Sequence, residues 1–479
     1  MPPPFSRRHF MTSVASGALL SAAGCSTVGR RYPPPFDVVV LGAGLAGLNA
    51  AMHLEAAGAR VLVLEAASRL GGRVLTLDDV PGTPESGGTQ ISYAYKRVVA
   101  AASQLGLKFA PNGRSPLLAE DAMNYFINGR RMTRAQWMAA SANPFADAQR
   151  GVPPDRLLGR LIGASPLASV AAWRDPANLP YDISLGAHLR SKGFSDEALR
   201  LVEINNSYGD SLDETSLLTL YHVQTNTAEL LKTPGPVVSV VGGNQRLPEA
   251  MAKSLQQKVM TNQRVTAVDA EQNSMRIRCA DGSVYFAAKV ICALPMPAMR
   301  NIAFSPTLPT TLAEAVSAVP YARVTQLHLA VERNFWKDEG ASPYVWSDGA
   351  LERVFPSDPT GSGNPQTLTC WINGRETARW DRLNDDEAGA LAVAEMKRIF
   401  PASEGALRLA RRVTWHAAPL AGGAWANWRP GQITRLAAAV AVPSGRLHFA
   451  GEHCGSGFRG LEAAMESGER AARAVIAGE

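Results

Sequence analysis

The stretch DVVVLGAGLAGLNAAMHLEAAGARVLVLEAA, residues 37–67, decides the fold of this chain. Within it, Val38–Leu41 is a continuous apolar run, which is typical of a strand buried on both faces. Leu45–Ala57 has the apolar spacing of a helix, and Gly58 is placed to end it. A second apolar run, Val61–Leu64, follows. The stretch therefore predicts a strand, a glycine-rich turn, a helix and a second strand, as in an α/β fold.

The turn between the first strand and the helix reads GAGLAG, residues 42–47. Gly42 permits a tight turn, Gly44 lets the backbone approach a pyrophosphate, and Gly47 allows close packing of helix on strand. The phosphates then lie at the positive end of the helix dipole. Glu65 ends the second strand about 20 residues on, where an acidic side chain binds the ribose 2′-hydroxyl and disfavours NADP. The segment predicts a Rossmann-type dinucleotide-binding domain.

The residues after the second strand favour a flavin over a nicotinamide. EAASRLGGRV, residues 65–74, contains the pair Gly71-Gly72 followed by Arg73. Such a pair allows close backbone approach, and the arginine supplies a cation beside the pyrophosphate. This segment resembles the FAD-specific extension of the flavin amine oxidase superfamily, which includes monoamine oxidases and L-amino-acid oxidases.

The resemblance continues through the rest of the chain in the same order as in that superfamily. It is carried by ESGGTQIS (85–92), VVGGNQRLPEAMAKSL (240–255), RVTAVDA (264–270), KVICALP (289–295) and FAGEHCGSGFRGLEAAMESGERAA (449–472). It implies an amine-oxidase-like mixed α/β fold that binds FAD without a covalent bond. The residues that it assigns to the cofactor are Gly42, Gly44, Leu45, Ala46, Gly47, Glu65, Ala66, Gly72, Arg73, Gly87, Gly88, Thr89, Gln90, Val265, Gly451, Glu452, Leu461 and Glu462.

Two glutamines stand where the superfamily often has a cation. Counting back from NFW (334–336), Gln326 occupies the position of a lysine that holds a water at flavin N5 and assists reaction with oxygen. Gln90 occupies the position of the arginine that clamps the substrate carboxylate in amino-acid oxidases. The sequence therefore predicts slow oxygen use and a weak anchor for α-amino acids.

The stretch GGAW, residues 422–425, resembles the G-G-C-Y element of the superfamily. Gly422 and Gly423 are expected to let the backbone approach the flavin, and Ala424 replaces the cysteine that bonds to flavin in some members. Trp425 replaces the tyrosine of the aromatic cage, although an ordinary core tryptophan is the alternative. The opposite cage position, counted back from ESGER, is Gly460, so the second wall is expected to be missing.

The expected reaction is FAD-dependent oxidation of a small-molecule amine, with Trp425, Gln326 and Gly460 at the reacting centre. Hydride passes from the carbon α to nitrogen to flavin N5, and the imine hydrolyses to an aldehyde or ketone plus ammonia or a smaller amine. Oxygen, a quinone or a cytochrome then reoxidises the flavin. The alternatives are an L-amino-acid oxidase, a desaturase or protoporphyrinogen-oxidase-like enzyme acting on a large hydrophobe, and a flavoprotein without enzymatic activity.

The expected domains are discontinuous in the sequence. The segment NYFINGRRM predicts a hairpin that turns at Asn128-Gly129, and about 135–230 has helical periodicity expected of a cap over the pocket. The expected division is an export signal and linker (1–33), an FAD-binding domain (34–105, 235–300 and 410–479) and a substrate-binding domain (106–234 and 301–409).

The first residues resemble an export signal. SRRHFMTSVASGALLSAAGC, residues 6–25, has paired Arg7 and Arg8 before a short, mildly apolar stretch, as in twin-arginine signals read by the Tat translocon. Such a signal implies a periplasmic protein. Cys25 is a candidate lipid-anchor site, cleavage after Ala23 is the competing outcome, and a disordered basic tail is the alternative.

Composition narrows the remaining classes. The 479 residues are 46% hydrophobic and 19% charged, with a net charge of +6, as in an ordinary globular protein. No basic run is interleaved with aromatic residues, so nucleic-acid binding is not expected. The five cysteines include no CxxC pair, so no metal site is expected. The oligomeric state is left open, with a homodimer as one option.

Overall fold

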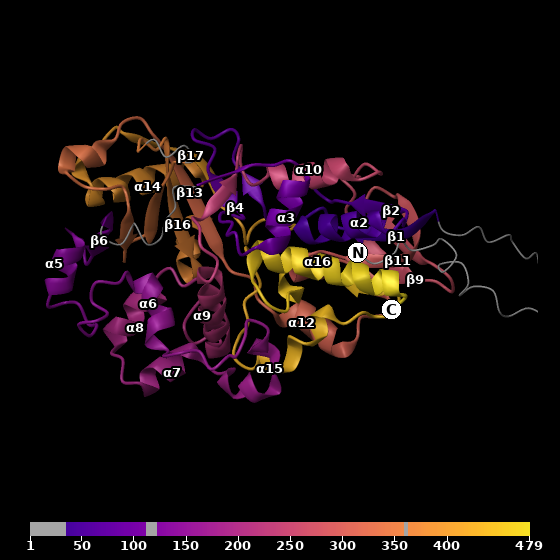
Figure 1. Ribbon diagram of the computed structural model, residues 1–479. Coiled ribbons are helices and arrows are strands. Elements are labelled where there is room, and N and C mark those ends of the chain that lie inside the picture. Colours follow the sequence, from indigo (N-terminus) through magenta and orange to yellow (C-terminus); the bar gives the residue numbers. More distant parts are fainter. Residues whose placement is uncertain (1–34, 112–121, 359–362) are drawn as a thin grey trace, which may run out of the picture.

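The computed structural model describes residues 35–111, 122–358 and 363–479, and two seven-stranded sheets organise them (Figure 1). The first sheet is built around β1 (Phe36–Leu41), which pairs in parallel with β2 (Val61–Leu64) and β11 (Val284–Cys292). β11 also pairs in parallel with β18 (Leu447–Phe449). The other strands of this sheet are β10 (Met275–Cys279), β9 (Val265–Ala270) and β12 (Ala303–Ser305).

The predicted opening unit is confirmed. Val38 and Val40 pack into one core cluster, Val39 and Leu41 into another, and none is more than 1% exposed. β1 is thus buried on both faces, as its continuous apolar run predicts. The helix that follows is α2 (Leu45–Ala56), and Gly58 ends it with a φ of +86°.

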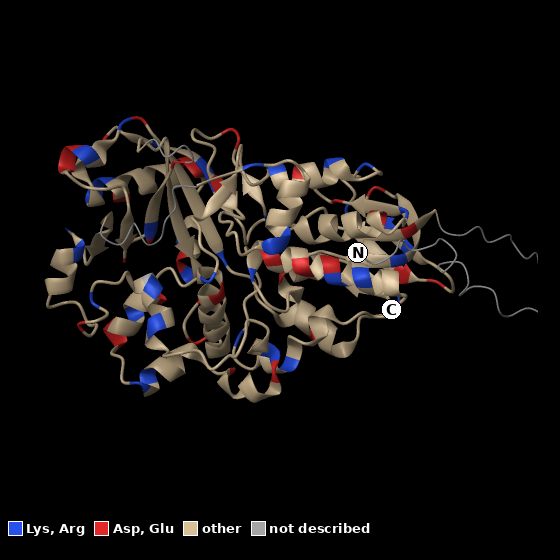
Figure 2. Ribbon diagram, viewed as in Figure 1, with Lys and Arg blue, Asp and Glu red and all other residues tan. Residues whose placement is uncertain are grey.

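The last helix of the chain completes this half of the molecule. α16 (Gly460–Ala477) lies beside α2, and Figure 1 shows the two running together over the first sheet. A Cβ at Gly468 would overlap the carbonyl group of Ala46, and a Cβ at Gly47 would overlap the carbonyl oxygen of Gly42. Glycine at both positions therefore permits the close approach of α2 to α16 and to the preceding turn. Acidic and basic residues are interspersed along α16 in Figure 2.

The second sheet forms the other end of the molecule in Figure 1, where α14 (Asp385–Ile399) packs on it. Its edge hairpin turns at Asn128-Gly129 with φ of 51° and 73°, which confirms the predicted hairpin and fits a type I′ turn. Its strand order is β17 (Leu407–Thr414), β13 (Val324–Val331), β16 (Thr367–Asn373), β15 (Arg353–Ser357), β14 (Val345–Ser347), β6 (Asn124–Ile127) and β7 (Arg130–Met132).

The segment predicted to be helical is helical, and Figure 1 shows most of it below the second sheet in that view. Pro interruptions divide it into short helices and 3-10 turns. Its α-helices are α5 (Arg134–Ala139), α6 (Pro154–Leu161), α7 (Leu185–Ser191), α8 (Asp196–Glu203) and α9 (Leu217–Leu231).

The limits of the predicted domains remain predictions, but strand pairing qualifies two of them. β12 pairs with β9 in the first sheet, although residues 301–409 are assigned above to the substrate-binding domain. β17 pairs with β13 in the second sheet and crosses the predicted limit between residues 409 and 410. Both limits depend on which strands pair across long sequence separations, and the local pattern does not contain that information.

The predicted export signal and Cys25 lie in residues 1–34, outside the described residues. Within the described segments, none of the helices has the length and hydropathy needed to traverse a bilayer. The four cysteines of these segments are buried free thiols, and no group of three or more His, Cys, Asp and Glu there could hold a metal ion.

Candidate active site

The glycine turn after β1 forms an open cradle at the start of α2. Gly42 has a φ of +97°, and Gly44 precedes the helix without a side-chain cap for its first backbone N–H groups. The Gly71 amide donates to the carbonyl oxygen of Ala43 (2.9 Å), which brings the second glycine motif against the first. A Cβ built on Gly72 would lie 3.5 Å from the Gly44 Cα. The uncapped helix start is therefore flanked by backbone without side chains, as phosphate binding requires.

Glu65 lies at the end of β2, beside this cradle. It is 8% exposed, and its carboxylate accepts hydrogen bonds from the amides of Ala43 and Ala67, both 2.8 Å. The backbone of Gln263, two residues before Val265, donates to the Glu65 carbonyl oxygen (2.8 Å). The predicted ribose ligand and the predicted adenine-contacting strand are thus adjacent, and Ala66 follows in the same loop.

Arg73 joins three segments that are far apart in the sequence. Its Nη1 donates to the carbonyl oxygen of Ala424 (3.0 Å) and to Oε2 of Glu452 (3.3 Å). Its guanidinium carbon lies 5.4 Å from the centroid of the Tyr321 ring. Gly451, with a φ of 140°, donates from its amide to Oγ of Ser467 on α16 (2.9 Å). The second glycine motif, the GGAW element and the C-terminal motif therefore converge on one cation.

The start of α16 lies against the β4 segment (Glu85–Gly87). A Cβ on Gly88 would lie 3.1 Å from Cδ2 of Leu461. Glu462 is 1% exposed, and its carboxylate accepts from the amides of Arg97 and Val98 at the start of α3 (Lys96–Gln104). The Glu462 side chain therefore caps a helix. Any contact of this residue with the cofactor is through its backbone.

Gln326 lies on β13 and is fully buried. Its Oε1 accepts a hydrogen bond from Oγ of Ser86, and its Nε2 has no hydrogen-bond partner among the described residues. The indole nitrogen of Trp415 donates to the backbone oxygen of Ser86 (3.0 Å), which fixes this arrangement. A buried donor without a partner is costly, so this position is unusual for a glutamine that serves packing alone.

Trp425 is held at the wall of a cavity. Its indole nitrogen donates to the Ser207 carbonyl oxygen (2.8 Å), and its backbone oxygen accepts from the Ala322 amide (2.8 Å). Gly422 and Gly423 have a packing role in addition to the one predicted, which stays a prediction. A Cβ on Gly422 would overlap Pro297, and one on Gly423 would overlap Tyr321. These glycines accommodate the close approach of the protein's own chain.

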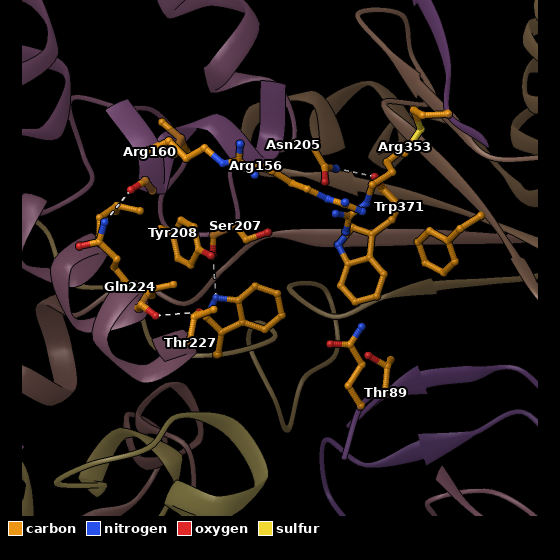
Figure 3. Close-up of a pocket in the computed structure, with 18 of the residues that line it drawn as sticks. Thr89, Arg156, Arg160, Asn205, Ser207, Tyr208, Gln224, Thr227, Arg353 and Trp371 are labelled. Atoms are coloured by element: carbon orange, nitrogen blue, oxygen red, sulfur yellow. Dashed lines mark hydrogen bonds between the residues drawn. The ribbon is translucent and has the colours of Figure 1, made fainter. Parts of the chain in front are cut away.

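The cavity has a volume of about 820 Å³ and opens between the helical segment and the second sheet (Figure 3). Among the predicted site residues, it includes Thr89, Gln90 and Trp425. Gly460 lines a smaller cavity of about 300 Å³ that also includes Trp425 and Tyr208, and no atom lies within 4 Å of a Cβ built on Gly460. Among the described residues, the space beside Gly460 is therefore open, and the missing second wall stays a prediction. The polar and aromatic lining residues that the sequence did not single out are Arg156, Arg160, Asn205, Ser207, Tyr208, Gln224, Thr227, Tyr344, Arg353, Phe355 and Trp371.

A buried carboxyl group supports one wall of the larger cavity. Glu352 accepts from Nδ2 of Asn205 (2.7 Å), and the same Nδ2 donates to the Trp371 carbonyl oxygen (2.6 Å). Burial raises the pKa of Glu352 to about 8, although the hydrogen bonds from Asn205 and the Asn373 amide oppose that rise. At neutral pH this group is therefore mostly uncharged.

The residues present fit an FAD molecule. The cradle of Gly42, Gly44 and Gly72 leaves room for a pyrophosphate, and Glu65 is placed for the ribose. Arg73, which is bound to Glu452, provides the adjacent cation. These features come from separate elements that meet at the carboxyl ends of β1 and β2, where α/β sheets bind ligands.

Replacement of Arg73 tests this assignment. Arg73→Gln should raise the Kd for FAD about tenfold or more, because a hydrogen bond to a charged group is worth about 1.5–3 kcal/mol. Flavin fluorescence during titration of apoprotein measures the change. Arg408→Gln is the control, since Arg408 is exposed and pairs with Glu332 on the second sheet. Equal FAD affinity in the two variants would contradict the assignment.

Comparison with known proteins matches residues 45–476 to the family described as Flavin containing amine oxidoreductase. A flavin-containing amine oxidase of Danio rerio is 25% identical over 456 residues, which cover 92% of this chain and 86% of that one. Two solved structures share the fold. Cyclohexylamine oxidase from Brevibacterium oxydans matches with a TM-score of 0.76 and 22% sequence identity. Putrescine oxidase bound to putrescine matches with a TM-score of 0.75 and 23% sequence identity. The two alignments cover 93% and 92% of this chain, respectively, and 99% of each of the two solved chains.

The family match spans α2, the second sheet and the C-terminal motif together, and it confirms the predicted fold class and cofactor. The chain therefore belongs to the flavin-containing amine oxidoreductases, enzymes that use FAD to oxidise amines.

Proposed function

We propose that the amine is oxidised in the 820 Å³ cavity, with Trp425 and Gln326 at the flavin end. The observation that carries this proposal is the convergence of two motifs on one cavity. Thr89 and Gln90 follow β4, whose Ser86 holds Gln326, and Trp425 belongs to the element whose backbone binds Arg73. A substrate in this cavity therefore has access to the residues beside the cofactor.

When bound, FAD supplies a two-electron acceptor for hydride from the carbon α to nitrogen, leaving an imine that water converts to a carbonyl compound and ammonia or amine. The chain contributes positioning and exclusion of water. Trp425 is fixed by its hydrogen bond to Ser207, and Trp371 supplies a second indole to the wall. Aromatic walls favour the uncharged amine, whose nitrogen lone pair is needed to form the C=N bond. We further propose that FAD is bound non-covalently, since Ala424 offers no thiol.

An anaerobic titration tests the proposed activity. A panel of linear amines, diamines, cyclic amines and amino acids is mixed with the enzyme without oxygen, and loss of the oxidised flavin absorbance is recorded. We expect at least one class of amine to reduce the flavin, and Trp425→Ala to slow reduction at least tenfold by loosening the substrate. Denaturation of the same sample should release all the flavin. Reduction by polyenes or porphyrinogens but by no amine would favour the desaturase-like alternative.

We also propose that a quinone or a cytochrome, and not oxygen, is the main electron acceptor. The support is Gln326, which is neutral, buried and hydrogen-bonded to Ser86 where the superfamily often keeps a lysine. A cation there would stabilise the negative charge that develops on oxygen during reoxidation. Gln326 has no charge to offer.

The acceptor proposal predicts slow reoxidation of the reduced enzyme in air and faster reoxidation by a soluble quinone. Gln326→Lys should raise the second-order rate constant with oxygen about tenfold or more, measured by stopped flow. Gln326→Leu, which also lacks a cation, should remain slow with oxygen. FAD content checks that both variants fold. Oxygen rates that are equal in Gln326→Lys and the unaltered enzyme would refute the proposal.

We propose that the protein is exported to the periplasm by the twin-arginine pathway, on the basis of Arg7, Arg8 and the mildly apolar residues that follow. That pathway carries folded proteins, which suits a chain that acquires FAD in the cytoplasm. Attachment of a lipid at Cys25 remains one alternative to cleavage after Ala23.

Fractionation of the host cell tests the export proposal. Changing Arg7 and Arg8 together to lysine should retain FAD-loaded protein in the cytoplasm, whereas Arg30→Lys, outside the motif, should not. Cys25→Ala should move the protein from the membrane to the soluble periplasmic fraction only if the lipid is attached. Export of the double-lysine variant at normal levels would show that the twin arginine is not the signal.

A further inference from the structure

The loop that precedes α16, residues 455–459, is held by side chains of the helical segment. Three consecutive backbone carbonyl oxygens of this loop each accept a hydrogen bond from one such side chain. The pairs are Arg174 Nη2 with Gly455 (2.9 Å), Trp173 Nε1 with Ser456 (3.0 Å) and His222 Nε2 with Gly457 (2.6 Å). These carbonyl groups therefore point toward the helical segment, and a shift of the loop would break the bonds.

The three donors also pack against one another. Trp173 and Arg174 belong to the 3-10 helix η2 (Ala172–Arg174), and His222 lies on α9. The rings of Trp173 and His222 are stacked, with 4.9 Å between their centroids and 10° between their planes. The guanidinium carbon of Arg174 lies over the Trp173 ring, 4.4 Å from its centroid. Stacking and cation–π contacts therefore fix the three donors relative to one another.

His222 holds the loop without adding a charge. A carbonyl oxygen can only accept, so Nε2 of His222 is the donor in its bond to Gly457. Burial and the positive charges of Arg459 and Arg174 lower the pKa of His222 to about 3, although the hydrogen bond to Gly457 opposes that shift. At neutral pH the ring is therefore uncharged, with its proton on Nε2.

The loop connects two parts of the cofactor site. Glu452, the partner of Arg73, lies shortly before it, and Gly460, the first residue of α16, follows it. Arg459 at the end of the loop and Gly460 line the smaller cavity together with Trp425. The position of the loop therefore sets where α16 begins relative to the Arg73–Glu452 pair and to Trp425.

We propose that Trp173, Arg174 and His222 are positioning residues that hold the N-terminus of α16 toward the flavin and thereby raise the reduction potential of the flavin. The inference rests on the proposed function, in which the flavin lies beside Gln326 and Trp425, and deepens it. Two-electron reduction places negative charge on the flavin ring, and the positive end of a helix dipole stabilises such a charge. Because this stabilisation falls off within the first turn of a helix, the position of that turn decides its size.

The reduction potential of the bound flavin tests the proposal. The double variant Trp173→Phe with His222→Phe removes two of the three donors and keeps two aromatic rings. The potential is measured without amine, by equilibration with a reference dye during chemical reduction of the FAD-loaded enzyme. We expect the equilibrium constant for two-electron reduction to fall at least fivefold, which corresponds to about 20 mV. His222→Gln, whose amide N–H can still donate, should retain most of the potential.

A matched control separates the lost hydrogen bonds from a general loosening of the helical segment. Trp137 on α5 is also fully buried, but its Nε1 has no hydrogen-bond partner among the described residues. Trp137→Phe should therefore leave the potential unchanged. In the apoprotein, hydrogen exchange at the amides of residues 455–462 should be faster in the double variant than in Trp137→Phe. Trp173→Phe alone should lower the equilibrium constant about twofold, and it replaces the double variant if that variant does not retain FAD.

The outcomes separate this proposal from the proposed amine oxidation. A potential that is the same in the double variant and the unaltered enzyme, or that falls equally in Trp137→Phe, would overturn the positioning role. If neither Trp173 variant retains FAD, unchanged hydrogen exchange in the apoprotein would overturn it as well. If the potential falls as expected but no amine reduces the flavin, the positioning role stands and the proposed amine oxidation fails.

A further readout applies where an amine does reduce the flavin. Neither Trp173 nor His222 lines the larger cavity, so the double variant should lower the reduction rate constant and leave the Kd of the amine within about twofold. A change in the Kd alone would contradict the proposal, because it would show that the two residues act on the substrate.

Discussion

The site depends on the ion pair between Arg73 and Glu452. The two side chains are 22% and 12% exposed, so each has lost most of its hydration, and removal of one partner would leave the other charge without compensation. Arg73 also binds the backbone oxygen of Ala424, one residue before Trp425. The cation that is expected to neutralise the pyrophosphate therefore also holds the wall of the substrate cavity in place. Cofactor binding and the position of Trp425 are coupled through one guanidinium group.

The strand register of the second sheet fixes the spacing of the residues along the proposed substrate cavity. Gln326, Trp371 and Arg353 are opposite one another on three neighbouring strands, so the spacing between Gln326 and Arg353 is fixed by the strand separation. The buried contact of Asn205 with both Glu352 and the Trp371 backbone attaches the helical segment to these strands. A protonated Glu352 can hold this attachment without adding a negative charge beside Arg353.

Much of the fold could be predicted from the pattern of residues within short stretches of sequence, whereas much of the substrate cavity could not. Residues 37–67 and the Asn128-Gly129 turn were predicted because a helix, a buried strand and a type I′ turn each leave a signal within a few residues. No such signal marks the arginines that line the cavity. Arg156 and Arg160 lie in a helical segment with many arginines, and Arg353 lies in a separate strand. Gly422 and Gly423 show another limit. The sequence indicates where a side chain is disfavoured, but it does not indicate that Pro297 and Tyr321 are the groups that a side chain there would meet.

The side chains expected near the flavin carry less positive charge in this chain than the superfamily pattern implies. Neutral Gln326 and Gln90 stand at the two positions where the superfamily that this chain resembles often has a cation near the flavin. Arg353 lies two strands from Gln326 in the second sheet, with about 10 Å between their Cα atoms. Stabilisation of a negatively charged reduced flavin would then fall to the backbone at the start of α16, whose first N–H groups have no side-chain cap among the described residues. A helix N-terminus provides about half a positive charge in a fixed direction, and it cannot move toward oxygen as a flexible lysine can. The lack of a mobile cation at Gln326 therefore agrees with the proposal that oxygen is not the main electron acceptor.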